Sequence, residues 1–167
     1  MSRFVLFVIV ALGVTGCGYK LGEIRPTPMR SVRSLAVPNF KNDTYESRIE
    51  ILFADTLTKT LQQDGTYRIV PSDQADAVLY CTLTRIERSP LRSVQNNVLA
   101  TSEYGLTVHC RYEVVHQGTG AVLKSGTATG RGSFFSGNDL QTIQRQGLSN
   151  TAADLARNLA TTLTEGW

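Results

Sequence analysis

The chain has 167 residues, 19% of them charged and 41% hydrophobic, and this length and composition indicate a single globular domain. The formal net charge at pH 7 is only +3, with no block of like charges and no charged tail. Because a dedicated nucleic-acid-binding protein concentrates positive charge on one face, nucleic acid is not an expected partner.

The N-terminus has the pattern of a secretory signal peptide. Arg3 precedes an apolar run over residues 4–14, which is shorter than the roughly 20 residues that a membrane-spanning helix needs. The letters VTGC, ending at Cys17, resemble the lipobox of bacterial lipoproteins. That resemblance implies cleavage after residue 16, with a covalent diacylglycerol and an N-acyl lipid such as palmitate on Cys17. Two or three acyl chains hold a protein stably on a membrane, whereas one does not.

Residues 17–31 are predicted to be a lipidated tether, and residues 32–167 a single folded domain. Pro26 and Pro28 oppose a helix in the tether, and its threonine and arginines keep it polar. Gly18 stands where many inner-membrane lipoproteins have an Asp, so the sequence permits an outer-membrane location.

The domain begins with a predicted strand over residues 34–40, which Pro38 interrupts. Asp43 and Glu46 have the spacing of a helix capping box, and Gly65 supplies a stop. Between them, apolar side chains recur every three or four positions and predict one helix packed on a sheet. A short extended piece follows at residues 67–70.

Three long strands come next, over residues 76–88, 101–115 and 122–135, with a hairpin turn at residues 117–121. The letters SGND then supply a second helix start, and an apolar stripe continues from Leu140 to Leu163. The predicted order is β-α-β-β-β-α. Strands grouped between helices predict an α+β fold, in which two helices pack on one face of a mostly antiparallel four-stranded sheet.

The sequence gives no catalytic residue, no metal site and no cofactor. It lacks a phosphate-binding loop, a zinc-protease helix motif and a nucleophile elbow. His109 and Cys110 are neighbours on a strand, so their side chains point to opposite faces and do not form a nucleophile–base pair. The expectation is therefore a non-enzymatic protein.

Cys81 and Cys110 both fall on core-facing strand positions. Two alternatives stay open for them, because buried free cysteines are common and disulfides persist in exported proteins. A register that sets Arg88 opposite Glu103 also sets Cys81 opposite Cys110, which would allow a disulfide.

Basic residues are dense near the strand ends, with Arg85, Arg88 and Arg92 around the first long loop and Arg131 before the letters GSFF. Solvated surface charge is one interpretation of these arginines. A phosphate-binding patch is the other, because guanidinium groups match phosphate geometry.

Nearly all of the mature chain resembles the lipopolysaccharide-assembly lipoproteins of the LptE family, although the segment after SFF is not closely matched. Five segments in order carry the resemblance: GCGYKL (16–21), LAVPNFKNDTYESRIE (35–50), ADAVLYCTLTRIER (75–88), SEYGLTVHCRYEV (102–114) and RGSFF (131–135). It implies a lipoprotein on the periplasmic face of the outer membrane, tethered to the inner leaflet. It also implies a 1:1 complex with the LptD β-barrel, in which the lipoprotein is a plug and assembly factor, and binding of lipopolysaccharide during transport to the outer leaflet.

Arg85, Arg88, Arg92 and Arg131 are the candidate lipopolysaccharide-binding residues by type and position, with Leu91 and Val94 offered for acyl chains. The letters LAVPNFKNDT also suit a second class, the exported lipoproteins of secretion-channel or curli-type assemblies. The Glu-Tyr strand start and RGSFF favour the LptE resemblance.

Overall fold

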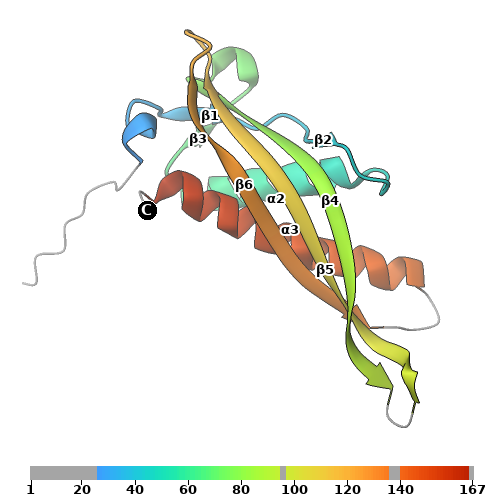
Figure 1. Cartoon of the computed structure of the whole chain (residues 1–167). Helices are drawn as coiled ribbons and strands as arrows, with labels where there is room; N and C mark the ends of the chain where they lie inside the picture. The colour runs from blue at the N-terminus through green and yellow to red at the C-terminus, as the bar shows by residue number, and fades with distance from the viewer. Residues whose placement is uncertain (1–25, 95–96, 136–139, 166–167) are drawn as a thin grey trace, which may run out of the picture.

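The computed structural model describes residues 26–94, 97–135 and 140–165, and shows one mixed sheet with both helices on one face (Figure 1). The long strands β4 (Ala77–Val94), β5 (Asn97–His116) and β6 (Val122–Phe135) pair antiparallel. The short strands β1 (Ser34–Ala36), β2 (Lys41–Asn42) and β3 (Arg68–Ile69) pair in parallel.

The sheet order is β3-β1-β4-β5-β6, and β2 also pairs with β4. The predicted α+β class is confirmed, but the sheet is mixed and has six strands rather than four. β2 and β3 are each two residues long, so neither strand spans enough residues to show an alternating pattern.

Helices α2 (Ile49–Asp64) and α3 (Leu140–Thr164) pack on the same side of the sheet, and two 3₁₀ turns, η1 (Thr27–Met29) and η2 (Ser72–Gln74), complete the elements. The predicted stripe of α3 is confirmed between Leu148 and Leu163, because its members are at most 6% exposed. Among the described residues no helix has the length and apolar character to cross a membrane.

The start of α2 differs from the prediction. The helix begins at Ile49, and the expected capping box at Asp43 and Glu46 lies outside it. The backbone N–H of Asp43 instead donates to the Leu83 carbonyl, which continues the pairing of β2 with β4. Asp43, which its spacing from Glu46 had assigned to the helix start, is therefore bound to the sheet instead. The predicted stop is confirmed, because Gly65 has φ +75° and its N–H donates to Leu61.

The packed part of the chain reaches upstream of Val32 into the segment expected to be tether. Met29 is fully buried, and the segment around it forms η1 despite the two prolines. The prolines permit this short 3₁₀ turn because a proline in a first turn lacks only an N–H that would have no helical partner.

The predicted register between β4 and β5 is also wrong at the cysteines. Cys81 pairs with Tyr112, and Leu83 pairs with Cys110, so the two cysteines are diagonal neighbours. Val94 pairs with Asn97 at the hairpin tip, as in the predicted register. The prediction assumed that this register continues without a shift along both strands. Irregularities between Leu83 and Val94 then shift the alignment by two residues at Cys81.

Two α3 side chains occupy the outer edge of β6. The Asn158 amide donates to the Thr129 carbonyl at 2.8 Å, and the Arg131 N–H donates to the Asp154 carboxylate at 2.9 Å. Edge strands expose backbone groups that can pair with another chain, so these bonds close the middle of the β6 edge.

Asp76 holds β1 beside the start of β4. One of its carboxylate oxygens accepts the backbone N–H groups of Arg33 at 2.9 Å and Ser34 at 2.8 Å. These bonds, Arg33 first, lower the pKa of Asp76.

Replacing Asp76 with Asn should lower the free energy of unfolding at pH 7 by about 1–2 kcal/mol, because two backbone donors lose a charged acceptor. A depressed pKa in the folded protein means that the stabilisation is complete above the unfolded-state pKa. It is then lost as pH falls through the folded-state value. Urea unfolding should therefore show that the free energy of unfolding falls more between pH 7 and pH 3 in the wild type than in Asp76→Asn. Equal losses would contradict this role.

Candidate functional site

The four candidate arginines do not gather on one face of the sheet. Arg88 pairs with Leu106, which is 1% exposed beneath the helices, so Arg88 points to the helix side. Arg85 pairs with His109, one residue from the buried Cys110, and so lies on the open side. Arg131 also lies on the open side, since Gly130 and Gly132 on either side of it meet α3.

Carboxylates lie beside two of the candidate arginines, Arg85 and Arg92. Arg85 Nη2 lies 2.9 Å from Glu87 Oε1, and His109 Nε2 lies 3.6 Å from the other oxygen of Glu87. Arg92 Nε lies 4.0 Å from Glu103. Arg85 and Arg92 are therefore each offset by a nearby negative charge.

The helix side holds a pocket of about 770 Å³, which we call the arginine pocket. It lies between the β2–α2 loop, the start of α2, β4 and α3. Its lining combines three guanidinium groups and one carboxylate with a fully exposed tyrosine and apolar side chains: Arg48, Arg88, Arg145, Glu46, Tyr45, Ile49, Leu52 and Leu148.

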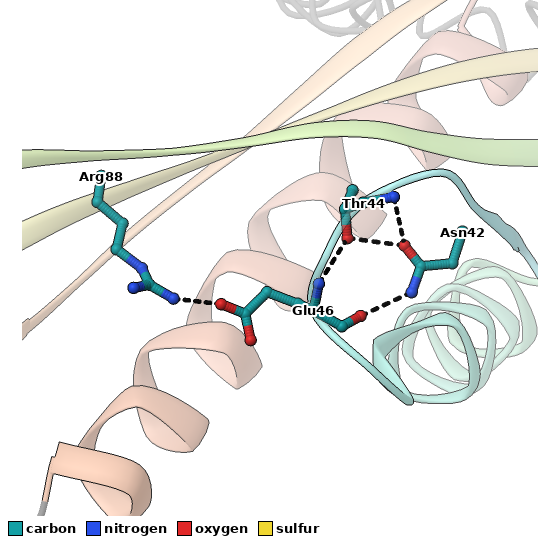
Figure 2. A network of polar contacts seen from close by, with 4 residues as sticks. All are labelled: Asn42, Thr44, Glu46 and Arg88. Carbon is teal, nitrogen blue, oxygen red and sulfur yellow. Dashed lines mark hydrogen bonds and ion pairs between the residues drawn. The ribbon is translucent and has the colours of Figure 1, made fainter.

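A polar network holds the loop that forms one wall of the pocket (Figure 2). Asn42 Oδ1 accepts the backbone N–H and the hydroxyl of Thr44, at 3.0 and 2.7 Å. The Asn42 amide donates to the Glu46 carbonyl at 2.7 Å and to Glu50 at 3.0 Å. Glu46 then extends its carboxylate to the guanidinium of Arg88. Arg88 is therefore fixed and neutralised at its place on the pocket wall.

The remaining two arginines give the pocket its charge. Within the ranges that the structure describes, neither Arg48 nor Arg145 has an acidic group within 4.0 Å. Three guanidinium groups face a single carboxylate, so a positive surplus lies beside the apolar side chains of Ile49 and Leu148.

Arg48 is held in an unusual backbone conformation at the N-cap of α2. Its φ is +65°, the left-handed region that non-glycine residues adopt at a cost of about 1 kcal/mol or more. We expect Arg48→Gly to raise the free energy of unfolding by up to about 1 kcal/mol and Arg48→Ala to leave it unchanged, because alanine keeps the strain. Urea unfolding of the two variants measures the difference. An equal free energy for both would show that Arg48 carries no strain.

Sequence reasoning identified Arg88 but not Arg48, Arg145 or Tyr45. Arg48 and Tyr45 fell inside a predicted helix, where a charged or aromatic residue on the outer face attracts no notice. Arg145 lies one turn before Leu148 and Ser149 on α3, a spacing that places the three on one helix face. Only the packing of α3 beside the β2–α2 loop brings that face to Arg48.

Cys81 and Cys110 are free thiols buried in the core. A hydrogen bond to Cys110, and then burial, raise the pKa of the Cys81 thiol. Diagonal neighbours on antiparallel strands are farther apart than directly opposed residues, which disfavours a disulfide. We therefore expect thiol titration of denatured, unreduced protein to find both groups free. A protein without titratable thiols would show instead that the strands shift to form the bond.

The described residues contain no group of three or more His, Cys, Asp and Glu side chains able to hold a metal ion. The surplus guanidinium groups of the pocket are suited to binding an anion.

Comparison with known families decides what kind of protein this is. The family model LptE, described as lipopolysaccharide-assembly, matches residues 32–165. The chain belongs to the LptE family. It is thus a lipopolysaccharide-assembly lipoprotein of the bacterial envelope, in a non-enzymatic family with no known cofactor. No curated protein sequence matches the chain.

Solved structures similar to this LptE-family chain share its fold at low sequence identity. Protein CT253 from Chlamydia trachomatis is 7% identical, with a TM-score of 0.56, and the match covers 78% of this chain and 94% of that one. XCC0632 from Xanthomonas campestris is 14% identical, with a TM-score of 0.53, covering 83% and 93%. A Caulobacter crescentus protein assigned as a lipoprotein is 16% identical, with a TM-score of 0.51, covering 75% and 87%.

Proposed function

We propose that this LptE-family protein is anchored by Cys17 to the inner leaflet of the outer membrane, on its periplasmic face. There it forms a 1:1 complex with the LptD β-barrel, as plug and assembly factor, and binds lipopolysaccharide on its way to the outer leaflet. The family match over residues 32–165 carries this proposal. Residues 1–16 would be the cleaved signal peptide, and the chain from Cys17 would link the anchor to the domain.

The open side of the sheet is the surface we assign to the barrel. Helices α2 and α3 leave it uncovered (Figure 1). It carries Arg85, Glu87 and His109 and the half-exposed Tyr80. Polar and aromatic side chains of this kind suit a protein–protein interface in which charged groups find partners.

Affinity purification of the full lipidated chain from solubilised outer membranes tests the complex. We expect a large barrel protein to co-purify in a 1:1 ratio. A homo-oligomeric ring without a barrel would contradict the proposal and would favour the secretion-channel or curli-type class.

The anchor has a separate test. Cys17→Ser should move the protein from the membrane fraction to the soluble periplasmic fraction, because the acyl chains have no other attachment residue in this proposal. Ser72→Cys in the Cys17→Ser background is a matched control, since it adds a cysteine at an exposed position outside the lipobox and should not restore membrane association. Membrane association of Cys17→Ser would contradict lipidation as the anchor.

A further inference from the structure

We propose that the arginine pocket is a binding site for a phosphorylated amphiphile, with phosphate at Arg48 and Arg145 and an acyl chain over Ile49, Leu52 and Leu148. This inference rests on the proposed function, which supplies a ligand of that chemistry. It assigns the ligand to the helix side of the sheet, and it includes residues that the four candidate arginines did not.

Charge is the first argument. Glu46 neutralises Arg88, and in the described part of the chain Arg48 and Arg145 keep no acidic partner within 4.0 Å. Guanidinium groups bind phosphate through paired hydrogen bonds, which gives both strength and orientation. Two unpaired guanidinium groups on one pocket are therefore suited to an anion.

The apolar lining is the second argument. Ile49 is 5% exposed and Leu148 is 6% exposed, so both present a small apolar surface inside the pocket. Leu52 adds a half-buried side chain from the next turn of α2. A ligand that offers both phosphate and hydrocarbon would use the whole lining, whereas inorganic phosphate would use only the arginines.

A neighbouring hollow gives an internal comparison. It measures about 430 Å³ and shares Tyr45, Glu46 and Arg88 with the arginine pocket. Its lining holds two carboxylates and two guanidinium groups, from Asp43, Glu46, Arg85 and Arg88, so its charge is balanced. The surplus positive charge is thus a property of the arginine pocket and does not extend to every hollow near the loop.

Three double variants of the full lipidated protein in detergent test the assignment, with binding of fluorescent lipopolysaccharide as the measurement. Arg48→Gln with Arg145→Gln removes the pocket charges. Arg85→Gln with Arg131→Gln removes the same charge from the open side. Arg111→Gln with Arg157→Gln is the matched control at exposed positions outside the pocket. Thermal unfolding confirms that each variant is folded.

We expect the pocket variant to raise the dissociation constant about tenfold or more, with the other two near the wild-type value. Equal weakening in all three would mean non-specific charge attraction and would overturn the pocket. Loss only in the open-side variant would also overturn it, but would leave the proposed function standing. Absence of binding by the wild type, together with absence of a co-purifying barrel, would reject both.

Competition separates the possible sources of the phosphate. Inorganic phosphate and a dephosphorylated lipopolysaccharide are each used to displace the fluorescent ligand from the wild-type protein. The amphiphile proposal expects both to compete weakly. Displacement by inorganic phosphate as effective as that by unlabelled lipopolysaccharide would show a simple anion site. Equal displacement by the dephosphorylated form would show that phosphate is not recognised.

Discussion

Gly130→Ala should lower the free energy of unfolding by about 3 kcal/mol or more, at the upper end of the range for overpacked sites. A Cβ at this position would lie 2.4 Å from the Thr151 carbonyl oxygen and 2.7 Å from the Leu155 Cβ. Because the nearest atom belongs to the backbone of α3, no side-chain rotation relieves the clash. The helix would have to move away from β6 and lose packing along its length.

Urea unfolding measures this effect, and Gly118→Ala is its matched control. A Cβ at Gly118 would meet only the His116 ring, at 3.5 Å, which is ordinary contact distance. We expect this control to change the free energy of unfolding by less than about 0.5 kcal/mol. A loss below about 1 kcal/mol for Gly130→Ala would mean that α3 does not approach β6 as closely as the structure shows.

Phe53→Ala should lower the free energy of unfolding by about 3–5 kcal/mol. Phe53 is 1% exposed and is among the largest fully buried side chains of the domain. It projects from α2 into the core that both helices share with the sheet. Its removal gives up the burial of an aromatic ring and leaves a cavity that the neighbouring helix and strands fill only in part.

Ile51 provides the comparison on the same helix, because it is 49% exposed. Ile51→Ala should change the free energy of unfolding by less than about 1 kcal/mol, as measured by the same urea titration. The contrast tests which face of α2 is buried. Equal losses for the two variants would show that the helix is rotated from its position in the structure.

The regular elements could be predicted from the sequence because each has a strong period. Residues 122–135 were predicted as a strand and are β6, and the stripe that includes Leu155 and Leu159 is buried. Alternation and helical spacing are local properties, so a single chain reveals them. The family resemblance, confirmed over residues 32–165, rests on the order of such segments.

The strand register and the arginine pocket depend on contacts between distant segments, so they could not be predicted in the same way. The register error at Cys81 arises from irregularities in β4. Pro90 marks one of them in the sequence, but no residue of this kind marks the shift between Leu83 and Arg85. The start of α2 moved to Ile49 because β2 pairs with β4, a contact between distant segments. Arg48 and Arg145 are nearly a hundred positions apart, and only helix packing places them on one pocket.

The last turn of α3 sets a limit on when the domain can close during secretion. The Tyr67 hydroxyl donates to the Leu163 carbonyl at 2.7 Å, and the Lys124 ammonium donates to the Thr162 carbonyl at 2.6 Å. In the export that we propose, the chain emerges from its N-terminus, so the apolar side of the strands stays uncovered until this turn arrives. The proposed lipid on Cys17 would then join the chain before the core is complete.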